Sequence, residues 1–375
     1  MMLDDITRAV LAREEVVAYL NGSHGESGEQ AEERIHGYLD ELRTRQRYPI
    51  YRALKHPLYP ILRKITRVTE NVASVREATR RGRVVYVSNH RSHLDYLIEP
   101  LALEDGEIRP PVIAAGINLF GGPLGLIHRH VTGAIPIRRN TKDPAYLITL
   151  KAYVAEILGR HDLMFYIEGG RSYSGEMKAP KTGLVHAALQ AGRSDLLFVP
   201  CAVSYDLVLE DFILARQKVK RAQRPFTFEL AEMVRYAVGY RSRAFVTFGT
   251  PIEAAGFDPH ARRDILALAH RMRDTIGRLM KVPPTAIVAR ALRPSLRRAE
   301  LEARVGGLLE LLSAAGANLA VTDPKAAVDD AIRRFDQRGI VLIDGDRFRI
   351  RERNLLRYYG RTIEHLLPVP PSKAH

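Results

Sequence analysis

The segment VVYVSNHRSHLDYLIEPLAL, residues 84–103, is the part of the sequence that best indicates the fold class. Its first part, VVYVS (84–88), is a run of β-branched and aromatic residues that is typical of a buried strand. Its last part, HLDYLIEPLAL (93–103), continues as a helix, for which Ser92 is a natural N-cap. A strand therefore leads through a polar turn directly into a helix.

The same alternation repeats along the middle of the chain. Further strands are predicted at VIAA (112–115), LMFYIE (163–168), LLFVPCAVSY (196–205), FTFEL (226–230) and AFVTFG (244–249). Helical patterns fall near residues 92–104, 142–160, 181–192, 211–222 and 258–281. Short strands that alternate with helices indicate an α/β domain.

Two regions of different character flank this domain. The N-terminal residues look helical and polar, with a flexible loop predicted at NGSHGESGEQ (21–30). After KVPPT (281–285) the chain looks helical and basic, and IVLIDGDRFRI (340–350) predicts a hairpin with Asp-Gly at its turn. A last amphipathic helix is expected near 353–367. We predict three regions: N-terminal helices (1–80), a middle domain (81–285) and a winged-helix-like C-terminal unit (286–375).

The charge balance of the 375-residue chain is basic, with 57 Lys and Arg against 43 Asp and Glu and a net charge of +14. Such a field favours anionic partners, namely nucleic acid, an acidic membrane surface or a phosphorylated substrate. The alternative is that the charge serves solubility alone. The single cysteine, Cys201, excludes an internal disulfide and a cysteine-rich zinc site, and it indicates a reducing compartment.

Neither a secretory signal nor a membrane-spanning helix is predicted. The N-terminal segment MMLDDITRAVLAREEV is acidic and broken by charges, unlike a signal peptide. The apolar stretch PPVIAAGINLFGGPLGLI (110–127) holds too many glycines and prolines for a free-standing spanning helix. It reads as a strand followed by an apolar loop, which is either buried in the core or in contact with lipid.

The turn SNHRSHLDY (88–96) places a base and a carboxylate close together. Residues five positions apart do not share a helical face, so His90 and Asp95 meet only if His90 lies on the turn before the helix. A carboxylate bound to one imidazole nitrogen would orient the ring and leave the other nitrogen as a general base. The alternative is that Asp95 only caps the helix, with SHLD as a capping box. His93 is the rival base.

A second polar turn, FYIEGGRSYSG (165–175), has the composition of an anion site. A strand delivers Glu168 to the Gly169-Gly170 turn, and Arg171 and Ser172 follow. Glycines allow backbone N–H groups to approach an anion, and arginine binds phosphate bidentately. The alternative is a surface turn with an incidental arginine.

Further cations lie elsewhere in the sequence. Lys181 in APKTG (179–183) is near a helix start, where the dipole favours an anion. In GAIPIRRN (133–140), Arg138 and Arg139 are neighbours on an extended segment, so at most one of them faces a site. Neither a nucleotide-binding P-loop nor the nucleophile elbow of hydrolases fits the glycine pattern of these turns.

These segments, in this order, resemble the motifs of the glycerolipid acyltransferase superfamily, and specifically the glycerol-3-phosphate and dihydroxyacetone-phosphate acyltransferases. The matching segments are NHRSHLD (89–95), GAIPIRR (133–139), YIEGGRSYSG (166–175) and FVPCAVSYD (198–206). Two departures are Ile135 and Pro136, where the family usually has aromatic residues, and Tyr173, where a basic residue is common. HRSH and EGGRS favour the glycerol-3-phosphate branch.

The resemblance implies a fold and a reaction. The fold is a mixed β-sheet flanked by helices, with residues 81–285 as the catalytic domain. The reaction is transfer of an acyl group from acyl-CoA or acyl-acyl carrier protein to the 1-hydroxyl of glycerol 3-phosphate, the first step of phospholipid synthesis. Dihydroxyacetone phosphate and lysophosphatidate are alternative acceptors. The resemblance implies catalytic roles for His90 and Asp95, no metal and no bound cofactor, and substrate binding by Arg138, Arg139, Glu168, Gly169, Gly170, Arg171, Ser172, Lys181 and Pro200.

The expected partners are glycerol 3-phosphate, an acyl thioester, acyl carrier protein and an anionic membrane surface. The basic stretches ARQKVKRAQR (215–224) and ARALRPSLRR (289–298) are candidates for headgroup contacts, or else ordinary solvated helix faces. We therefore expect a cytoplasmic protein, peripheral on the inner face of the membrane. A nucleic-acid-binding protein is the remote alternative, disfavoured because the chemical motifs lie outside the winged-helix-like unit.

Overall fold

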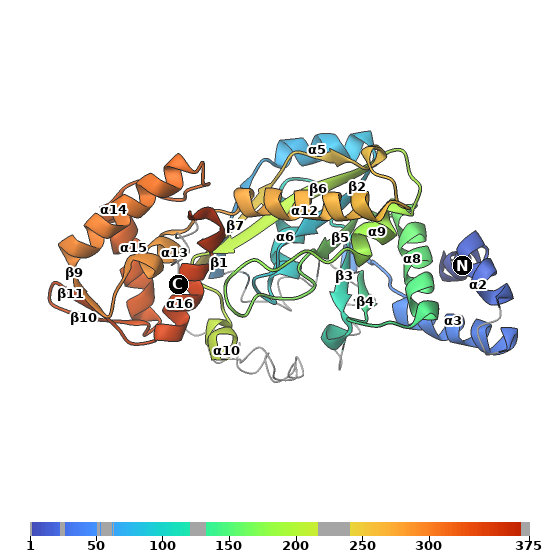
Figure 1. The fold of residues 1–375 in the computed structure, drawn as a ribbon, viewed down its shortest axis with the longest axis horizontal. Helices are drawn as coiled ribbons and strands as arrows, with labels where there is room; N and C mark the ends of the chain where they lie inside the picture. Colours follow the sequence, from blue (N-terminus) through green and yellow to red (C-terminus); the bar gives the residue numbers. More distant parts are fainter. Residues whose placement is uncertain are drawn as a thin grey trace, which may run out of the picture.

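A computed structural model describes residues 2–22, 27–50, 53, 62, 64–120, 133–216 and 241–368. The chain is a mixed α/β structure, as predicted, and it is built around one large sheet (Figure 1). N-terminal helices lie beside one end of this sheet, and a C-terminal unit lies beside the other.

The main sheet has the strand order β1-β7-β6-β2-β5-β3-β4, and β8 pairs with β6 outside this path. The strands are β1 (Ile65–Glu70), β2 (Arg83–Ser88), β3 (Val112–Gly116), β4 (Ala134–Ile137), β5 (Leu163–Tyr166), β6 (Leu196–Tyr205), β7 (Ser242–Phe248) and β8 (Ile252–Glu253). Strand β2 pairs in parallel with β5 and β6, and β3 pairs in parallel with β4 and β5. Strand β6 pairs antiparallel with β7 and β8. The carboxyl ends of β2, β5, β3 and β4 therefore meet at one edge, where ligands bind in open α/β sheets.

Both faces of this sheet are buried. In β2, Val84 and Tyr86 join one hydrophobic cluster, and Val85 and Val87 join another. Successive side chains of a strand point to opposite faces, so the continuous apolar run VVYV is what a doubly covered strand requires. The covering helices are α5 (Val72–Arg81), α6 (Asp95–Asp105), α8 (Pro144–Leu158), α9 (Gly183–Leu189) and α12 (Arg262–Leu279). The short helix α10 (Asp211–Arg216) packs against the C-terminal unit.

The N-terminal helices are α1 (Met2–Leu11), α2 (Glu14–Asn21) and α3 (Gly28–Leu42). They share the second cluster with α8, and α3 begins with a capping box formed by Ser27 and Gln30. The prediction that residues 1–80 are helical is wrong for β1, which pairs with β7 in the main sheet. In ITRVTE (65–70), four of the six residues are β-branched, which favours a strand, but the segment is too short for periodicity to decide.

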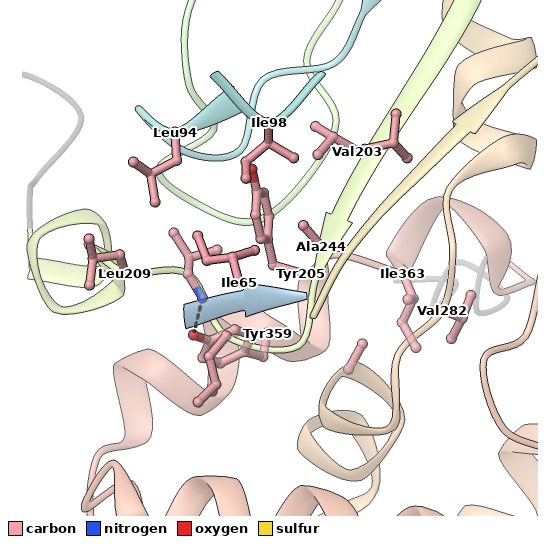
Figure 2. Packing of buried hydrophobic residues seen from close by; sticks show 14 of the residues in the cluster. Ile65, Leu94, Ile98, Val203, Tyr205, Leu209, Ala244, Val282, Tyr359 and Ile363 are labelled. Atoms are coloured by element: carbon pink, nitrogen blue, oxygen red, sulfur yellow. Dashed lines mark hydrogen bonds between the residues drawn. The ribbon is translucent and has the colours of Figure 1, made fainter. Parts of the chain in front are cut away.

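The C-terminal unit combines helices with a small antiparallel sheet in the order β10-β11-β9. Its elements are α13 (Pro284–Ala291), β9 (Ser295–Arg297), α14 (Arg298–Ala314), α15 (Pro324–Gln337), β10 (Val341–Asp344), β11 (Arg347–Ile350), α16 (Arg353–Arg361) and the short 3-10 helix η4 (Glu364–Leu366). The predicted hairpin is confirmed, and Gly345 at its turn has a φ of 58°. The unit is not separate, because its helices share one hydrophobic cluster with β6, β7 and α6 (Figure 2).

Several predictions concern, partly or wholly, residues that the structure does not describe. The strand at 226–230 and most of the basic stretch at 215–224 lie outside the described residues. The predicted region boundaries at residues 80 and 285 stay predictions. Within the described part of the chain, no helix is both long and apolar enough to cross a bilayer.

Candidate active site

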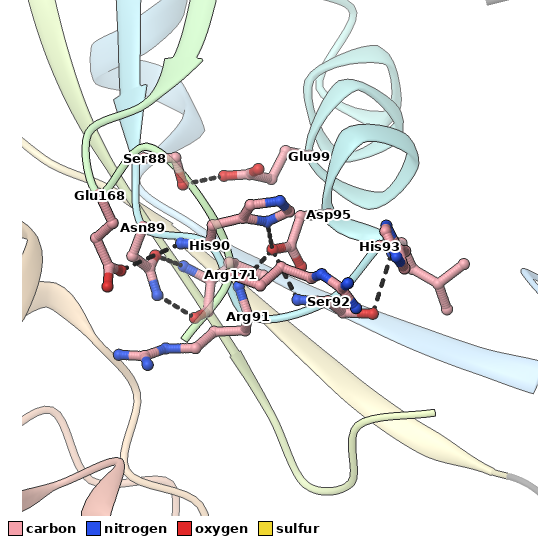
Figure 3. A network of polar contacts seen from close by, with 12 residues as sticks. Ser88, Asn89, His90, Arg91, Ser92, His93, Asp95, Glu99, Glu168 and Arg171 are labelled. Atoms are coloured by element: carbon pink, nitrogen blue, oxygen red, sulfur yellow. Dashed lines mark hydrogen bonds and ion pairs between the residues drawn. The ribbon is translucent and has the colours of Figure 1, made fainter. Parts of the chain in front are cut away.

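His90 and Asp95 meet at the carboxyl end of β2. The His90 Nδ1 atom lies 2.8 Å from Asp95 Oδ2 (Figure 3). His90 precedes α6 on a turn, and Asp95 is the first residue of that helix, as the interpretation of this pair required. The carboxylate is fully buried, and the imidazole is almost so. The other ring nitrogen, Nε2, is therefore left for chemistry.

Asp95 also caps the turn. The same carboxylate therefore pairs with His90 and binds the backbone, which were stated above as alternatives. Its Oδ2 atom accepts hydrogen bonds from the backbone N–H groups of Arg91 at 2.6 Å and Ser92 at 3.0 Å. Its Oδ1 atom accepts one from the Tyr205 hydroxyl at 2.7 Å. The helix begins three residues after the predicted cap at Ser92, whose hydroxyl instead accepts a bond from Leu94 N. These donors hold the carboxylate in one orientation toward the imidazole.

The protonation of His90 follows from its surroundings. Burial lowers the pKa of His90 to about 4, with Asp95 opposing the shift and Arg171 adding to it. The ring stacks on Tyr166, with centroids 4.1 Å apart and planes 11° apart. A neutral imidazole held flat against a phenol ring is a base ready to accept a proton at pH 7.

Glu99 lies one turn further along α6 and is fully buried. It accepts a hydrogen bond from the Ser88 hydroxyl. Burial, and then the charge of Asp95, raise the pKa of Glu99 well above its usual range. Both causes therefore favour the neutral form of Glu99 beside the His90–Asp95 pair.

Asn89 fixes the turn that carries His90. Its side-chain amide donates to Val203 O at 2.9 Å and accepts from Val203 N at 2.8 Å. The side chain thus takes the place of a backbone unit and extends the pairing of β2 with β6 by one step. Asn89 was not among the predicted site residues, although an Asn directly after a strand is a familiar turn signal.

The turn after β5 is tied to the histidine turn by backbone contacts. Glu168 is buried and accepts from His90 N at 3.3 Å and from Lys178 N at 2.9 Å. Ser172 N donates to His90 O at 3.1 Å, while the Ser172 hydroxyl donates to Glu176 O at 2.7 Å. Glu168 and Ser172 therefore hold the two turns together. The hydroxyl predicted to bind substrate is engaged with a carbonyl group.

Three exposed or half-buried cations gather around this turn. An added Cβ atom on Gly170 would lie 3.3 Å from Arg139 Nη1 and 3.8 Å from Lys178 Nζ. Gly169 has a φ of 68°, and a Cβ atom there would lie 3.0 Å from Lys181 Cγ. The glycines thus let Arg139, Lys178 and Lys181 approach the backbone closely, as an anion cradle requires.

Arg171 has a different environment from these cations. It is buried, and its Nη1 atom lies 3.4 Å from Glu210 Oε1. Its charge is therefore partly balanced inside the protein. Lys178, which the sequence analysis missed, donates from Nζ to Arg171 O at 2.8 Å. The sequence feature that could have identified Lys178 is its position within ten residues after the glycine turn.

Two predicted site residues lie away from the cradle. Arg138 pairs with Glu41 and stacks over the rings of Tyr38 and Tyr146, so it does not face the turn after β5. The alternation of side chains along a strand explains why only its neighbour Arg139 does. Pro200 is buried within β6 opposite Val87, and it accepts from Gly249 N at 2.8 Å. Pro200 is therefore part of the sheet that supports the site.

Comparisons with known proteins find similarity over the part of the chain that holds this site. A model of the family described as Acyltransferase matches residues 66–204. Residues 66–204 belong to the acyltransferase family. This acyltransferase domain includes both turns of the site and all the strands that carry them.

Curated relatives extend the similarity beyond the acyltransferase domain. The chain is 30% identical to the glycerol-3-phosphate acyltransferase of Aeromonas hydrophila, over 92% of this chain and 47% of the relative. It is 32% identical to that of Actinobacillus succinogenes, over 76% of this chain and 39% of the relative. The chain thus spans about half the length of the curated relatives it matches. A solved 1-acyl-sn-glycerophosphate acyltransferase from Thermotoga maritima is 14% identical, with a TM-score of 0.35, and the match covers 73% of this chain and 95% of that one.

Proposed function

We propose that the chain transfers an acyl group from an acyl thioester to the 1-hydroxyl of glycerol 3-phosphate, giving lysophosphatidate. The observation that carries the proposal is the buried His90–Asp95 pair beside a cluster of cations at one sheet edge. The names of the curated relatives support the same acceptor. The donor is acyl-CoA or acyl-acyl carrier protein.

His90 acts as the general base in this reaction. Its Nε2 atom takes the proton of the 1-hydroxyl as that oxygen attacks the thioester carbonyl carbon. The carbon–sulfur bond then breaks, the thiolate leaves with the electron pair, and the proton on His90 passes to that sulfur, so the imidazole is neutral again. A thiol of pKa about 8.5 needs little acid assistance to depart. Asp95 holds the imidazole and stabilises the imidazolium that forms.

The cations hold the phosphate of the acceptor. Arg139, Lys178 and Lys181 surround the glycine turn and supply charge-assisted donors. The reaction as proposed uses no metal and no bound cofactor, since the acceptor's own hydroxyl is the nucleophile. We place the protein on the cytoplasmic face of an anionic membrane, where its product is an amphiphile.

The first test is thiol release from palmitoyl-CoA in the presence of glycerol 3-phosphate. We expect His90→Ala and Asp95→Ala to lower kcat by about a hundred- to ten-thousand-fold, because each removes or misplaces the base. Thermal unfolding should show that both variants are folded. His93→Ala is the matched control, since His93 is the second histidine of the same turn and the rival base in the sequence.

An active His90→Ala protein would contradict the mechanism. Replacing glycerol 3-phosphate by dihydroxyacetone phosphate or by lysophosphatidate separates the alternative acceptors. Turnover with one of these alone would keep the acyl-transfer chemistry and correct the substrate.

A further inference from the structure

A buried acidic segment, Asp206–Asp211 (DLVLED), follows β6 and lies between the site and the C-terminal unit. Three of its residues are buried acids, namely Asp206, Glu210 and Asp211. Buried carboxylates are costly unless they are paired and hydrogen-bonded. In this segment the partners come from two different parts of the molecule.

Glu210 faces the catalytic loop, residues 89–94. Its Oε2 atom accepts from the Ser92 hydroxyl at 2.9 Å, and its Oε1 atom accepts from His93 N at 2.6 Å. Ser92 and His93 lie in the chain between His90 and Asp95 (Figure 3). Glu210 therefore fixes the loop conformation that lets the base and its carboxylate meet.

Asp211 faces the C-terminal unit. Arg338, which follows α15, donates from Nη2 to Asp211 Oδ1 at 2.6 Å, and Tyr359 of α16 donates to Asp211 Oδ2 at 2.6 Å. The Tyr359 hydroxyl also accepts from Val208 N at 3.0 Å, a bond drawn in Figure 2. Arg338 Nη2 in addition donates to Leu209 O at 2.7 Å. Two side chains of the C-terminal unit thus hold the segment at four atoms.

We propose that the C-terminal unit positions the catalytic loop through the acidic segment, with Tyr359 and Arg338 as positioning residues. Because Glu210 and Asp211 are consecutive and both fully buried, a shift of one moves the other. The inference rests on the proposed function only in calling the loop catalytic. It assigns a task to residues 286–368 that is neither substrate binding nor nucleic-acid binding.

A second contact joins α16 to the site. A Cβ atom on Gly175, where φ is 88°, would lie 2.2 Å from Tyr358 O, so α16 packs directly on this turn. Arg361 pairs with Glu176 at 3.3 Å. On the other side of the same turn, Arg91 of the catalytic loop donates to Gly175 O at 2.7 Å. The loop is therefore held toward α16 from two directions.

The chain offers a matched pair of variants for the test. Tyr359→Phe removes a hydroxyl that makes two of the holding bonds and keeps the ring. Tyr358→Phe removes the neighbouring hydroxyl on the same helix, which is buried and has no hydrogen-bond partner among the described residues. Both variants lose one oxygen atom, and the two rings are in edge-to-face contact with each other.

The measurement is hydrogen–deuterium exchange of the peptide spanning 88–96, followed by mass spectrometry, in the full chain without substrate. We expect Tyr359→Phe to speed exchange in this peptide by about tenfold or more, and Tyr358→Phe to leave it as in the wild type. Tyr359→Phe should also lower kcat by about tenfold or more, with KM changed less, because a small misplacement of a base is costly. Unchanged exchange in Tyr359→Phe would overturn the proposal.

A double-variant cycle separates positioning from general stability. If Tyr359 acts through Glu210 and Ser92, then Ser92→Ala combined with Tyr359→Phe should lower kcat little more than the stronger single change. Additive losses would overturn the proposal. A wild-type chain without acyl transfer would refute the proposed function, while the exchange experiment would still decide whether the C-terminal unit positions this loop.

Discussion

At the scale of single residues, Asp95 shows how one carboxylate serves two tasks. Its two oxygen atoms accept from the imidazole, two backbone N–H groups and a phenol. The backbone donors hold the carboxylate in place, and within the described part of the chain no lysine or arginine side chain is bonded to it. A cation bonded there would compete with His90 for its charge. The negative charge of Asp95 is thus directed at the imidazole.

The lowered pKa of His90 makes a prediction about pH. The folded pKa of about 4 lies below the value of about 6.5 for an exposed histidine. We expect kcat at saturating substrates to show no acid limb near pH 6.5, and to fall only as the pH nears 4. For the same reason, the contribution of neutral His90 to the free energy of unfolding is complete above about pH 6.5 and declines below it. An acid limb near pH 6.5 in both wild type and His93→Ala would contradict this.

Lys178 makes a prediction about acceptor binding. Its ammonium group lies beside Gly170 in the cation cluster, and burial lowers the pKa of Lys178 while Glu168 opposes the shift. We expect Lys178→Met to raise KM for glycerol 3-phosphate by about tenfold or more, through loss of a charge-assisted bond to phosphate. KM for palmitoyl-CoA should change less. Lys325→Met, an exposed change on α15, is the control, and equal effects of the two would argue against a phosphate contact.

At the scale of elements, parallel strands gather the site. The turn after β2 supplies the base, the turn after β5 supplies the glycines and lysines, and the end of β4 supplies Arg139. These strands are far apart in the sequence, but β2 and β5 are neighbours in the sheet, and β3 and β4 follow them. The end of β3 contributes space rather than a charge, because Gly116 lies against the guanidinium of Arg139.

Gly116→Ala tests this use of space. The added Cβ atom would lie 2.7 Å from Arg139 Nη2, and the side chain of Arg139 has to move away from the cradle. We expect a higher KM for glycerol 3-phosphate, by about tenfold, with little change in melting temperature. Gly307→Ala on α14 is the control, because no atom of the described residues lies within 4 Å of its added Cβ atom. That change should leave KM unaltered and stabilise the fold by about 0.5–1 kcal/mol.

At the scale of the whole molecule, the net charge of +14 favours an anionic surface. Two arginines of the basic stretch at 289–298 already form ion pairs within the chain, because Arg290 pairs with Glu364 and Arg298 pairs with Asp329. We expect the protein to float with vesicles that contain anionic lipid at low salt and to be released at high salt. Flotation with neutral vesicles, or flotation that salt does not weaken, would point to an apolar mode of binding instead.

The sequence by itself determined the α/β class, the turn that carries His90, and the glycine turn after the strand at 163–168. These features are local, because a strand followed by a capped helix and a Gly-Gly turn are encoded by adjacent residues. Only the tertiary structure decided which cations face the site. Arg138 and Arg139 differ only in the side of the strand from which each projects, and Arg138 projects toward Glu41.

The tertiary structure also decided the roles of Asn89, Gly116, Glu210 and Tyr359. Each acts on a residue from a distant part of the chain, and hydrophobic periodicity carries no information about such pairs. β1 was missed for a related reason. It is an edge strand whose pairing with β7 joins residues 65–70 to residues 242–247, and six residues give too short a pattern to decide between strand and helix.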